Sequence, residues 1–275
     1  MQGTLFVVAT PLGNLDDLSE HAVQVLGNVE ILACEDTRRT RKLLNHFQIK
    51  AHTLSYHEHN ESHRAPKLIS RLKEGQNIAL VSNAGTPQVS DPGFRLVRAC
   101  RQQGIPVFPI PGPSAVSAAI SVSGLPSDKF LFVGFLPPRK SLRLKELEIL
   151  KPVLASLLIF LPPHHLREQL EELQRVLGDR KAFLAKEMTK IHEKHWWGPL
   201  SQIIHDQQGT PRGEFTLVIE GSGSGHQQEK KIDIESYVHG LQEIRKMTLK
   251  EAIRQAAKDL GKRRNEVYRE VVIKD

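Results

Sequence analysis

Short apolar runs alternate with helix-like segments through the first part of the chain. Five runs are rich in β-branched and aromatic residues and poor in charge, at 4–10, 29–35, 53–56, 77–83 and 106–110. The segments between them have helical patterns, at 18–26, 37–47, 61–73, 92–103 and 113–122. Strands that are buried on both faces form continuous apolar runs, and strand–helix alternation builds a parallel sheet. The sequence therefore predicts an N-terminal α/β domain with a parallel sheet over residues 1–124.

The pattern changes in the next part of the chain. Apolar runs at 130–137, 156–162 and 182–188 still alternate with helical segments, at 141–150 and 165–177. Two further runs, "HWWGPLSQII" and "GEFTLVIEG", then follow with only a loop between them. That arrangement favours antiparallel or mixed strand pairing. We expect a second α/β domain with a mixed sheet over residues 125–221.

The last part of the chain is basic. A flexible linker is expected at 222–231, within "GSGSGHQQEKK". A small basic helical module is expected at 232–275, with two short helices broken at Gly261. Eight cations lie between Arg245 and Arg264, against the two acids Glu251 and Asp259: Arg245, Lys246, Lys250, Arg254, Lys258, Lys262, Arg263 and Arg264. The module suits nucleic-acid contact; the alternative is a solvated helix pair that covers a sheet edge.

The composition limits the class of protein. A net charge of +7 fits an anionic partner such as nucleic acid, although a merely basic surface would also explain it. Cys34 and Cys100 lie in apolar runs, which is typical of buried thiols in a reducing compartment. The first residues lack the basic segment of a signal peptide, and no apolar run approaches the ~20 residues of a membrane span. We therefore expect a cytoplasmic protein.

Three loops follow three of the predicted strands. They are "TPLGN" (10–14), "NAGTP" (83–87) and "PGPSA" (111–115). Because ligands bind outside the carboxyl ends of parallel strands, these loops should converge on one crevice. The sequence has no phosphate-binding glycine motif, and the loops contain no lysine. An uncharged or cationic nucleoside-type ligand is therefore favoured, with Gly85 allowing close approach of the backbone.

The segment "CEDTRRTRK" (34–42) places acids and cations beside this crevice. Glu35 and Asp36 end a predicted strand, and four cations follow on the first turns of a helix: Arg38, Arg39, Arg41 and Lys42. The acids could simply stabilise the helix N-terminus, with the cations solvated. Alternatively, the cations bind substrate phosphates. We expect them to contact RNA without affecting the cofactor loops.

Three histidines, His57, His59 and His63, follow the third predicted strand. No cysteine or carboxylate set completes a metal site with them, so we expect no metal and interpret the segment as a polar loop over the active site.

Eight stretches resemble one known family. They are "ATPLGNLDDLS", "ACEDTRRTRKLL", "SYHEHNE", "VSNAGTPQVSDPG", "PIPGPSAVSAAISVSGL", "FVGFLPPRK", "KEMTKIHE" and "GEFTLVIEG". In this order they are similar to the tetrapyrrole methylases, the class III S-adenosylmethionine methyltransferases, and among these to members that modify ribosomal RNA. The resemblance implies two α/β domains with S-adenosylmethionine in the cleft between them, and a homodimer. It also implies 2′-O-methylation of a cytidine in the decoding region of 16S rRNA, with the 30S subunit as partner.

The resemblance also assigns residues to the cofactor: Pro11, Leu12, Asn83, Ala84, Gly85, Thr86, Pro87, Ser114, Ala115 and Met188. Two departures concern the pocket. Asn83 stands where the family usually has Asp, and "LPPHH" (Leu161–His165) stands where it has "ESPHR". Restoring the acid by Asn83→Asp is expected to keep or tighten cofactor binding. Gly85→Val is expected to weaken binding with little loss of stability.

Methyl transfer to a hydroxyl depends mainly on alignment, and a base that polarises the ribose hydroxyl would add to the rate. Glu35, Asp36 and His57 are candidates for that base, and the sequence gives no reason to choose among them. Two other functions remain open. One is a tetrapyrrole-methylating enzyme of the same fold, and the other is a non-catalytic RNA-binding assembly factor.

Overall fold

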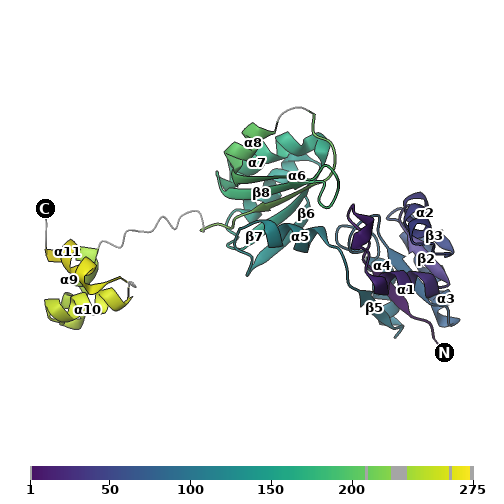
Figure 1. Ribbon diagram of the computed structural model, residues 1–275, viewed down its shortest axis with the longest axis horizontal. Coiled ribbons are helices and arrows are strands. Elements are labelled where there is room, and N and C mark those ends of the chain that lie inside the picture. The colour runs from purple at the N-terminus through teal and green to yellow at the C-terminus, as the bar shows by residue number, and fades with distance from the viewer. Residues whose placement is uncertain (1, 208–209, 224–233, 260–261, 273–275) are drawn as a thin grey trace. The chain divides into compact units, whose positions relative to one another are not determined.

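A computed structural model describes residues 2–207, 210–223, 234–259 and 262–272. The chain divides into two compact units, Met1–Ser222 and Gly223–Asp275 (Figure 1). The first unit contains two five-stranded sheets. Its two α/β parts confirm the fold class predicted from the sequence.

The first sheet is parallel, with strand order β3-β2-β4-β1-β5. Its strands are β1 (Leu5–Val8), β2 (Ile31–Cys34), β3 (Thr53–Ser55), β4 (Ile78–Val81) and β5 (Val107–Ile110). Each lies within one of the five apolar runs of the sequence. Burial on both faces is the reason that these runs lack charge: all four residues of β2 and of β4 are buried.

Helices cover both faces of this sheet (Figure 1). They are α1 (Glu20–Asn28), α2 (Thr37–His46), α3 (Glu61–Lys73) and α4 (Phe94–Gln102), with a short 3-10 turn η1 (Leu15–Asp17). Leu26 of α1 and Leu44 of α2 pack in the core on one face. Leu68 of α3 and Leu96 of α4 pack in the core on the other. The loops that follow the strands lie at the carboxyl ends of the strands.

The second sheet is mixed, with order β6-β7-β10-β8-β9. Its strands are β6 (Phe130–Phe135), β7 (Ser156–Leu161), β8 (Lys181–Lys186), β9 (Lys194–Pro199) and β10 (Phe215–Ile219). The β6–β7 pair is parallel and the other pairs are antiparallel. One face is covered by α6 (Lys140–Leu150), α7 (Leu166–Leu177) and α8 (Leu200–Asp206), with η2 (Pro163–His165) before α7.

The run "HWWGPLSQII" contains a helix as well as a strand, so more than a loop separates β9 from β10. The strand in "HWWGPLSQII" ends at Pro199, and α8 follows at once. Proline has no amide hydrogen for a strand ladder, and it is tolerated where a helix begins. Leu200 and Ile203 then lie three residues apart and are both buried, as in a helix with one apolar face. β9 therefore pairs with β8 and not with β10.

One helix crosses the boundary that the sequence suggests near residue 124. α5 (Ala115–Val122) begins after β5 of the first sheet, yet Ala119 packs against Val218 and Phe183 of the second. The segment "AVSAAISV" has no charged residue and suits burial against a sheet. Its N-terminus therefore lies at one sheet while its body belongs to the core of the other.

The second unit contains α9 (Ile234–Arg245), α10 (Leu249–Asp259) and α11 (Arg264–Val272). Val238, Ile253 and Val267, one from each helix, pack in a separate core. The sequence anticipated α10 and α11 but not α9. Most of the expected linker (224–231) and Gly261 lie outside the described residues. None of the described helices combines the length and apolarity needed to cross a bilayer.

Candidate active site

The loops that follow β1, β4 and β5 are bonded to one another. The backbone N–H of Thr10 donates to the Gly85 carbonyl at 2.9 Å, and the N–H of Gly85 donates back to Thr10 at 2.9 Å. The Thr86 hydroxyl donates to the Pro113 carbonyl at 3.2 Å. Since β4, β1 and β5 are neighbours in the sheet, the three loops meet at one edge, as the sequence predicts.

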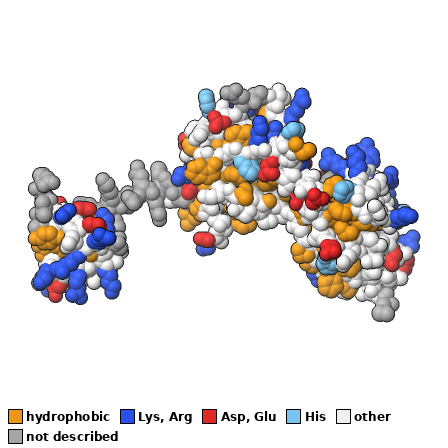
Figure 2. Space-filling view, in the orientation of Figure 1, with side chains coloured by type: hydrophobic (Ala, Val, Ile, Leu, Met, Phe, Trp, Pro, Cys, Tyr) orange, Lys and Arg blue, Asp and Glu red, His pale blue; other side chains and the backbone are white. Residues whose placement is uncertain are grey.

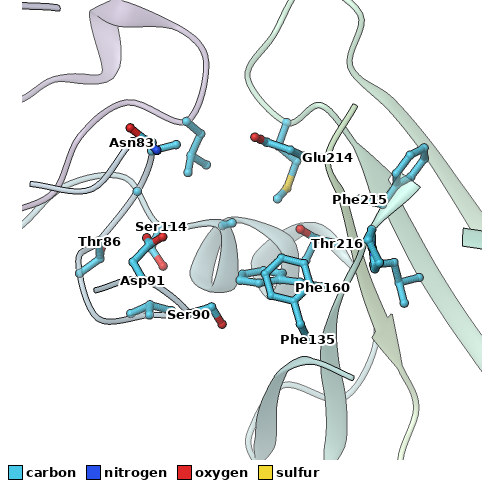
Figure 3. Close-up of a pocket in the computed structure, with 18 of the residues that line it drawn as sticks. Asn83, Thr86, Ser90, Asp91, Ser114, Phe135, Phe160, Glu214, Phe215 and Thr216 are labelled. Atoms are coloured by element: carbon cyan, nitrogen blue, oxygen red, sulfur yellow. The ribbon is translucent and has the colours of Figure 1, made fainter. Parts of the chain in front are cut away.

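A cavity of about 430 Å³ lies at this edge, within the size range of small-molecule sites. Polar side chains of the N-terminal loops line one side, and residues of the second sheet line the other (Figure 3). The lining residues are Leu12, Glu35, Arg39, Asn83, Ala84, Gly85, Thr86, Val89, Ser90, Asp91, Ser114, Ala115, Phe135, Phe160, Leu161, Pro162, Pro163, Met188, Glu214, Phe215 and Thr216.

Most residues expected at the cofactor are among these; Pro11 and Pro87 are not. Gly85 has φ +75°, and an added Cβ would lie 3.2 Å from the Leu12 side chain. A β-branched residue is strained at this φ. The expectation that Gly85→Val spares the fold is therefore wrong, because the backbone itself requires glycine here.

Asn83 and Glu35 form a polar pair inside the cavity. Glu35 follows β2 and Asn83 lies two residues beyond β4, and these strands are adjacent. Asn83 Nδ2 donates to Glu35 Oε2 at 2.7 Å. The other amide atom, Asn83 Oδ1, is buried without a hydrogen-bond partner in the described part of the chain. Buried polar atoms are normally paired, so this oxygen suits a donor on a ligand.

The other candidate bases lie outside the cavity lining. Asp36 caps α2 and accepts from the Arg38 backbone N–H at 2.8 Å. Its bonds to the Arg38 side chain and backbone hold the pKa of Asp36 below its usual value. His57 lies with Nε2 3.0 Å from Asn60 Nδ2. The structure thus separates Glu35 from the other two candidates.

The cations of α2 divide in the same way. All four cations are exposed, and of these four Arg39 alone lines the cavity. Figure 2 shows Lys and Arg side chains gathered over the α2 region. The expectation that the whole cluster lies away from the cofactor loops is wrong for Arg39, because this residue lies in the first turn of α2 and lines the cavity together with Asn83, Ala84 and Gly85.

Sequence reasoning missed Asp91. It lies in "SDPG", four residues after the predicted ligand loop at 83–87, and it lines the cavity. Burial raises the pKa of Asp91 to about 7, with a further contribution from the charge of Glu35 and a smaller one from Glu214. The Ser82 hydroxyl opposes this shift, although it also lies 3.2 Å from the carbonyls of Ala84 and Gly85. The signal in the sequence is an acid between small residues at the end of a ligand loop.

The second sheet contributes an aromatic wall and a further acid. The rings of Phe135 and Phe160 lie 5.5 Å apart, and both line the cavity (Figure 3). Glu214 accepts from Lys190 Nζ at 3.0 Å. Leu161, Pro162 and Pro163, from the departing "LPPHH" segment, also line the cavity, so this departure changes its wall.

The loop between β8 and β9 reaches the loop that follows β1. Met188 lines the cavity, and its neighbours Glu187 and Thr189 have φ of 52° and 64°. The Asn14 backbone N–H donates to the Thr189 hydroxyl at 3.2 Å. Non-glycine residues with positive φ are uncommon and cluster at ligand sites. In the described residues, no group of three or more His, Cys, Asp or Glu could hold a metal ion.

Comparisons with known proteins agree with this architecture. Two relatives called ribosomal RNA small subunit methyltransferase I are similar over most of their length. The Halalkalibacterium halodurans protein is 41% identical over 276 residues, which cover 97% of this chain and 94% of the relative. The Thermotoga maritima protein is 43% identical over 220 residues, which cover 80% of this chain and 99% of the relative.

A solved structure shares the fold at lower identity. The uroporphyrin-III-C-methyltransferase of Thermus thermophilus superposes with a TM-score of 0.57 at 21% identity, covering 83% of this chain and 98% of that one. The family model for tetrapyrrole (corrin/porphyrin) methylases matches residues 4–204. These include all the residues that line the cavity except Glu214, Phe215 and Thr216. The chain belongs to the family of tetrapyrrole (corrin/porphyrin) methylases.

Proposed function

We propose that this protein transfers a methyl group from S-adenosylmethionine to 16S rRNA, at the 2′-hydroxyl of a cytidine ribose in the decoding region. The observation that carries the proposal is the cavity, which is large enough for a nucleoside. Carboxylates line it, and Arg39 is the single cation among its described lining residues. The names of relatives at 41% and 43% identity supply the rRNA substrate. The cytidine and the 2′-oxygen come from the sequence resemblance.

The lining residues fit this cofactor. It supplies a methyl group on a positively charged sulfur, so a pocket that contains Glu35, Asp91 and Glu214 favours it electrostatically. The unpaired Asn83 Oδ1 would accept a hydrogen bond from a polar group of the nucleoside or amino acid. Gly85 gives the ligand access to the backbone. Phe135 and Phe160 form an apolar wall on the opposite side.

The RNA would approach over the exposed cations of α2. Arg41 and Lys42 are free to contact phosphates, which provide affinity without sequence readout. The basic second unit would add to this attraction. We further propose that the substrate is the 30S subunit, that the protein forms a homodimer and that it is cytoplasmic.

The test is methyl transfer to 30S subunits isolated from cells that lack the corresponding relative. Labelled S-adenosylmethionine, purified protein and these subunits should give one 2′-O-methylcytidine, mapped by nuclease digestion and mass spectrometry. Free 16S rRNA and a tetrapyrrole substrate serve as parallel acceptors. Transfer to the tetrapyrrole alone would overturn the rRNA assignment, and calorimetry that detects no cofactor binding would indicate a non-catalytic RNA-binding protein.

A further inference from the structure

We propose that Asp91 accepts the proton of the hydroxyl that is methylated. This inference rests on the proposed function and names a residue for its chemical step. It replaces the three candidate bases from the sequence with a fourth. It follows from the hydrogen bonds and ion pairs that the acids at the cavity form.

The other carboxylates at or near the cavity already have partners. Glu35 accepts the Asn83 amide at 2.7 Å, and Glu214 accepts Lys190 Nζ at 3.0 Å. Asp36 is bound to Arg38 and does not line the cavity. Within the described residues, Asp91 lines the cavity, forms no ion pair with Lys, Arg or His, and has the neutral Ser82 hydroxyl as its hydrogen-bonding partner. A carboxylate with one neutral hydroxyl as its partner keeps lone pairs available for a substrate hydroxyl.

The backbone around Asp91 is held in an unusual conformation. Gln88 and Ser90 have φ of 71° and 64°, although neither is glycine. Such strain persists where the surrounding structure enforces it, and it is common at functional sites. Ser90 lies against Gly134 in β6, where an added Cβ would be 2.9 Å from Ser90 Oγ. The second sheet thus contacts the loop that presents Asp91 to the cavity, and Asp91 lies across the cavity from Phe135 and Phe160 (Figure 3).

The charges that face Asp91 suit a base that works near neutral pH. Burial, the charge of Glu35 on the end of β2 and that of Glu214 before β10 raise its pKa to about 7, against the effect of the Ser82 hydroxyl. Arg39 of α2 lines the same cavity. General bases act best when their pKa lies near the working pH.

The step balances without any further reactant. The hydroxyl proton passes to a carboxylate oxygen of Asp91 as the hydroxyl oxygen forms its bond to the methyl carbon. The electrons of the broken carbon–sulfur bond remain on sulfur, which becomes neutral. The proton on Asp91 then leaves to solvent.

The first experiment is a pH profile of kcat/KM for methyl transfer to 30S subunits. The wild-type profile should rise with pH to a plateau, with its inflection near 7. Asp91→Asn should lower kcat/KM by about 10²–10⁴-fold and remove the inflection. Glu35→Gln should move the inflection to lower pH, because it removes a charge that disfavours ionisation of Asp91. Glu214→Gln should move it less, because the charge of Glu214 contributes less to the raised pKa of Asp91.

The second experiment does not depend on turnover. Calorimetry at pH 6.5, in two buffers of different ionisation enthalpy, counts the protons released when S-adenosylmethionine binds. The wild type should release a fraction of a proton, because a cation favours the charged form of Asp91. Asp91→Asn should still bind S-adenosylmethionine, which shows that the variant is folded, although more weakly than the wild type because one acid of the pocket has lost its charge, and it should release fewer protons.

The outcomes separate the two proposals. No transfer by the wild type to 30S subunits refutes the proposed function. A wild type that transfers methyl groups, with an Asp91→Asn variant that keeps the inflection or loses less than threefold in kcat/KM, refutes the role of Asp91 alone. If Asp91→Asn does not fold, the pH profile of Glu35→Gln decides. An inflection at the wild-type pH in that variant would also refute the role of Asp91.

Discussion

The Asn83–Glu35 pair explains why an amide at this position suits this chain. Asn83 Nδ2 donates to Glu35 at 2.7 Å, whereas an Asp at 83 would place two carboxylates in contact. Like charges at this distance cannot both ionise without a large cost. The hydrogen bond therefore predicts that Asn83→Asp lowers stability, whereas the expectation drawn from the family resemblance, that the change keeps or tightens cofactor binding, stays a prediction.

We predict that Asn83→Asp lowers the melting temperature at pH 8 and has a smaller effect at pH 5, where one carboxylate of the pair can hold a proton. Removing one partner of a buried hydrogen bond costs about 1–3 kcal/mol. Thermal melts across this pH range measure the effect. The matched control is the double variant Asn83→Asp/Glu35→Gln, which exchanges donor and acceptor. It should recover most of the loss, and failure to recover would show that the pair does not determine the stability.

Asp91 gives a second pH effect with a definite sign. Its folded pKa is raised from 3.8 to about 7, so between these values the folded state holds a proton that the unfolded state has lost. Stability then falls as pH rises through this window and levels off above 7. Asp91→Asn removes the titration. We predict that the variant melts above the wild type at pH 8 and that the difference narrows toward pH 5, as measured by calorimetric scans; a constant difference would contradict the raised pKa.

At the scale of elements, the cations of α2 differ in their relation to the cavity. Arg39, Arg41 and Lys42 are all exposed, and of these three Arg39 alone lines the cavity. We predict that Arg41→Ala/Lys42→Ala weakens 30S binding and reduces the slope of log affinity against log salt by roughly 0.7–0.9 for each lost phosphate contact. Cofactor affinity should be unchanged.

The matched control for α2 is Lys67→Ala/Lys73→Ala on α3. Both residues are exposed, and α3 covers the opposite face of the sheet from α2. The change in net charge is the same in the two double variants. Equal slopes of log 30S affinity against log salt would therefore show that binding depends only on net charge and not on the position of the cations. Arg39→Ala is a separate test, in which cofactor affinity is expected to change.

The bulge in β6 is a second element that serves the site. The register with β7 shifts between Phe132 and Gly134, and Gly134 has φ +74°. We predict that Gly134→Ala costs roughly 1–2 kcal/mol from the left-handed backbone and also weakens cofactor binding, because Ser90 must move. Denaturant unfolding and calorimetry measure the two effects. Gly27→Ala in α1, where no heavy atom lies within 4 Å of the added Cβ, should leave cofactor binding unchanged and raise stability slightly, because alanine favours a helix over glycine. Unchanged stability and unchanged cofactor binding in Gly134→Ala would rule out the contact with Ser90.

At the scale of the molecule, the two units have separate cores. Val238, Ile253 and Val267 belong to the second unit alone. The Thermotoga maritima relative is matched over 99% of its length by 220 residues of this chain, close to the extent of the first unit. We predict that a chain ending at Ser222 folds and binds S-adenosylmethionine within about twofold of the full chain. Its affinity for 30S subunits should fall, most strongly at low salt.

Calorimetry and filter binding of the two chains test this prediction. Loss of cofactor binding in the truncated chain would show that the second unit supports the cavity. Unchanged 30S affinity at every salt concentration would favour the alternative in which the basic residues of this unit are merely solvated.

The sequence by itself determined the strands and the ligand edge. Strands β1 to β5 were predicted because burial on both faces requires an apolar run. Such a run indicates a strand even when the neighbouring strands in the sheet are not known. The convergence of the loops at 10–14, 83–87 and 111–115 followed from the geometry of parallel strands. Where local pattern failed, as at Pro199 and α8, the run contained two short elements of similar composition.

Only the tertiary structure decided which side chains share the cavity. Asp36 and Glu35 are adjacent in sequence, yet one caps a helix and the other faces Asn83. α5 leaves the first sheet and packs on the second, which no local pattern encodes. Asp91 acquires its character from burial and from Glu35, a residue far away along the chain. Local propensity determines the elements of this protein, but the desolvation and charge pairing that define a site arise only when distant residues are packed together.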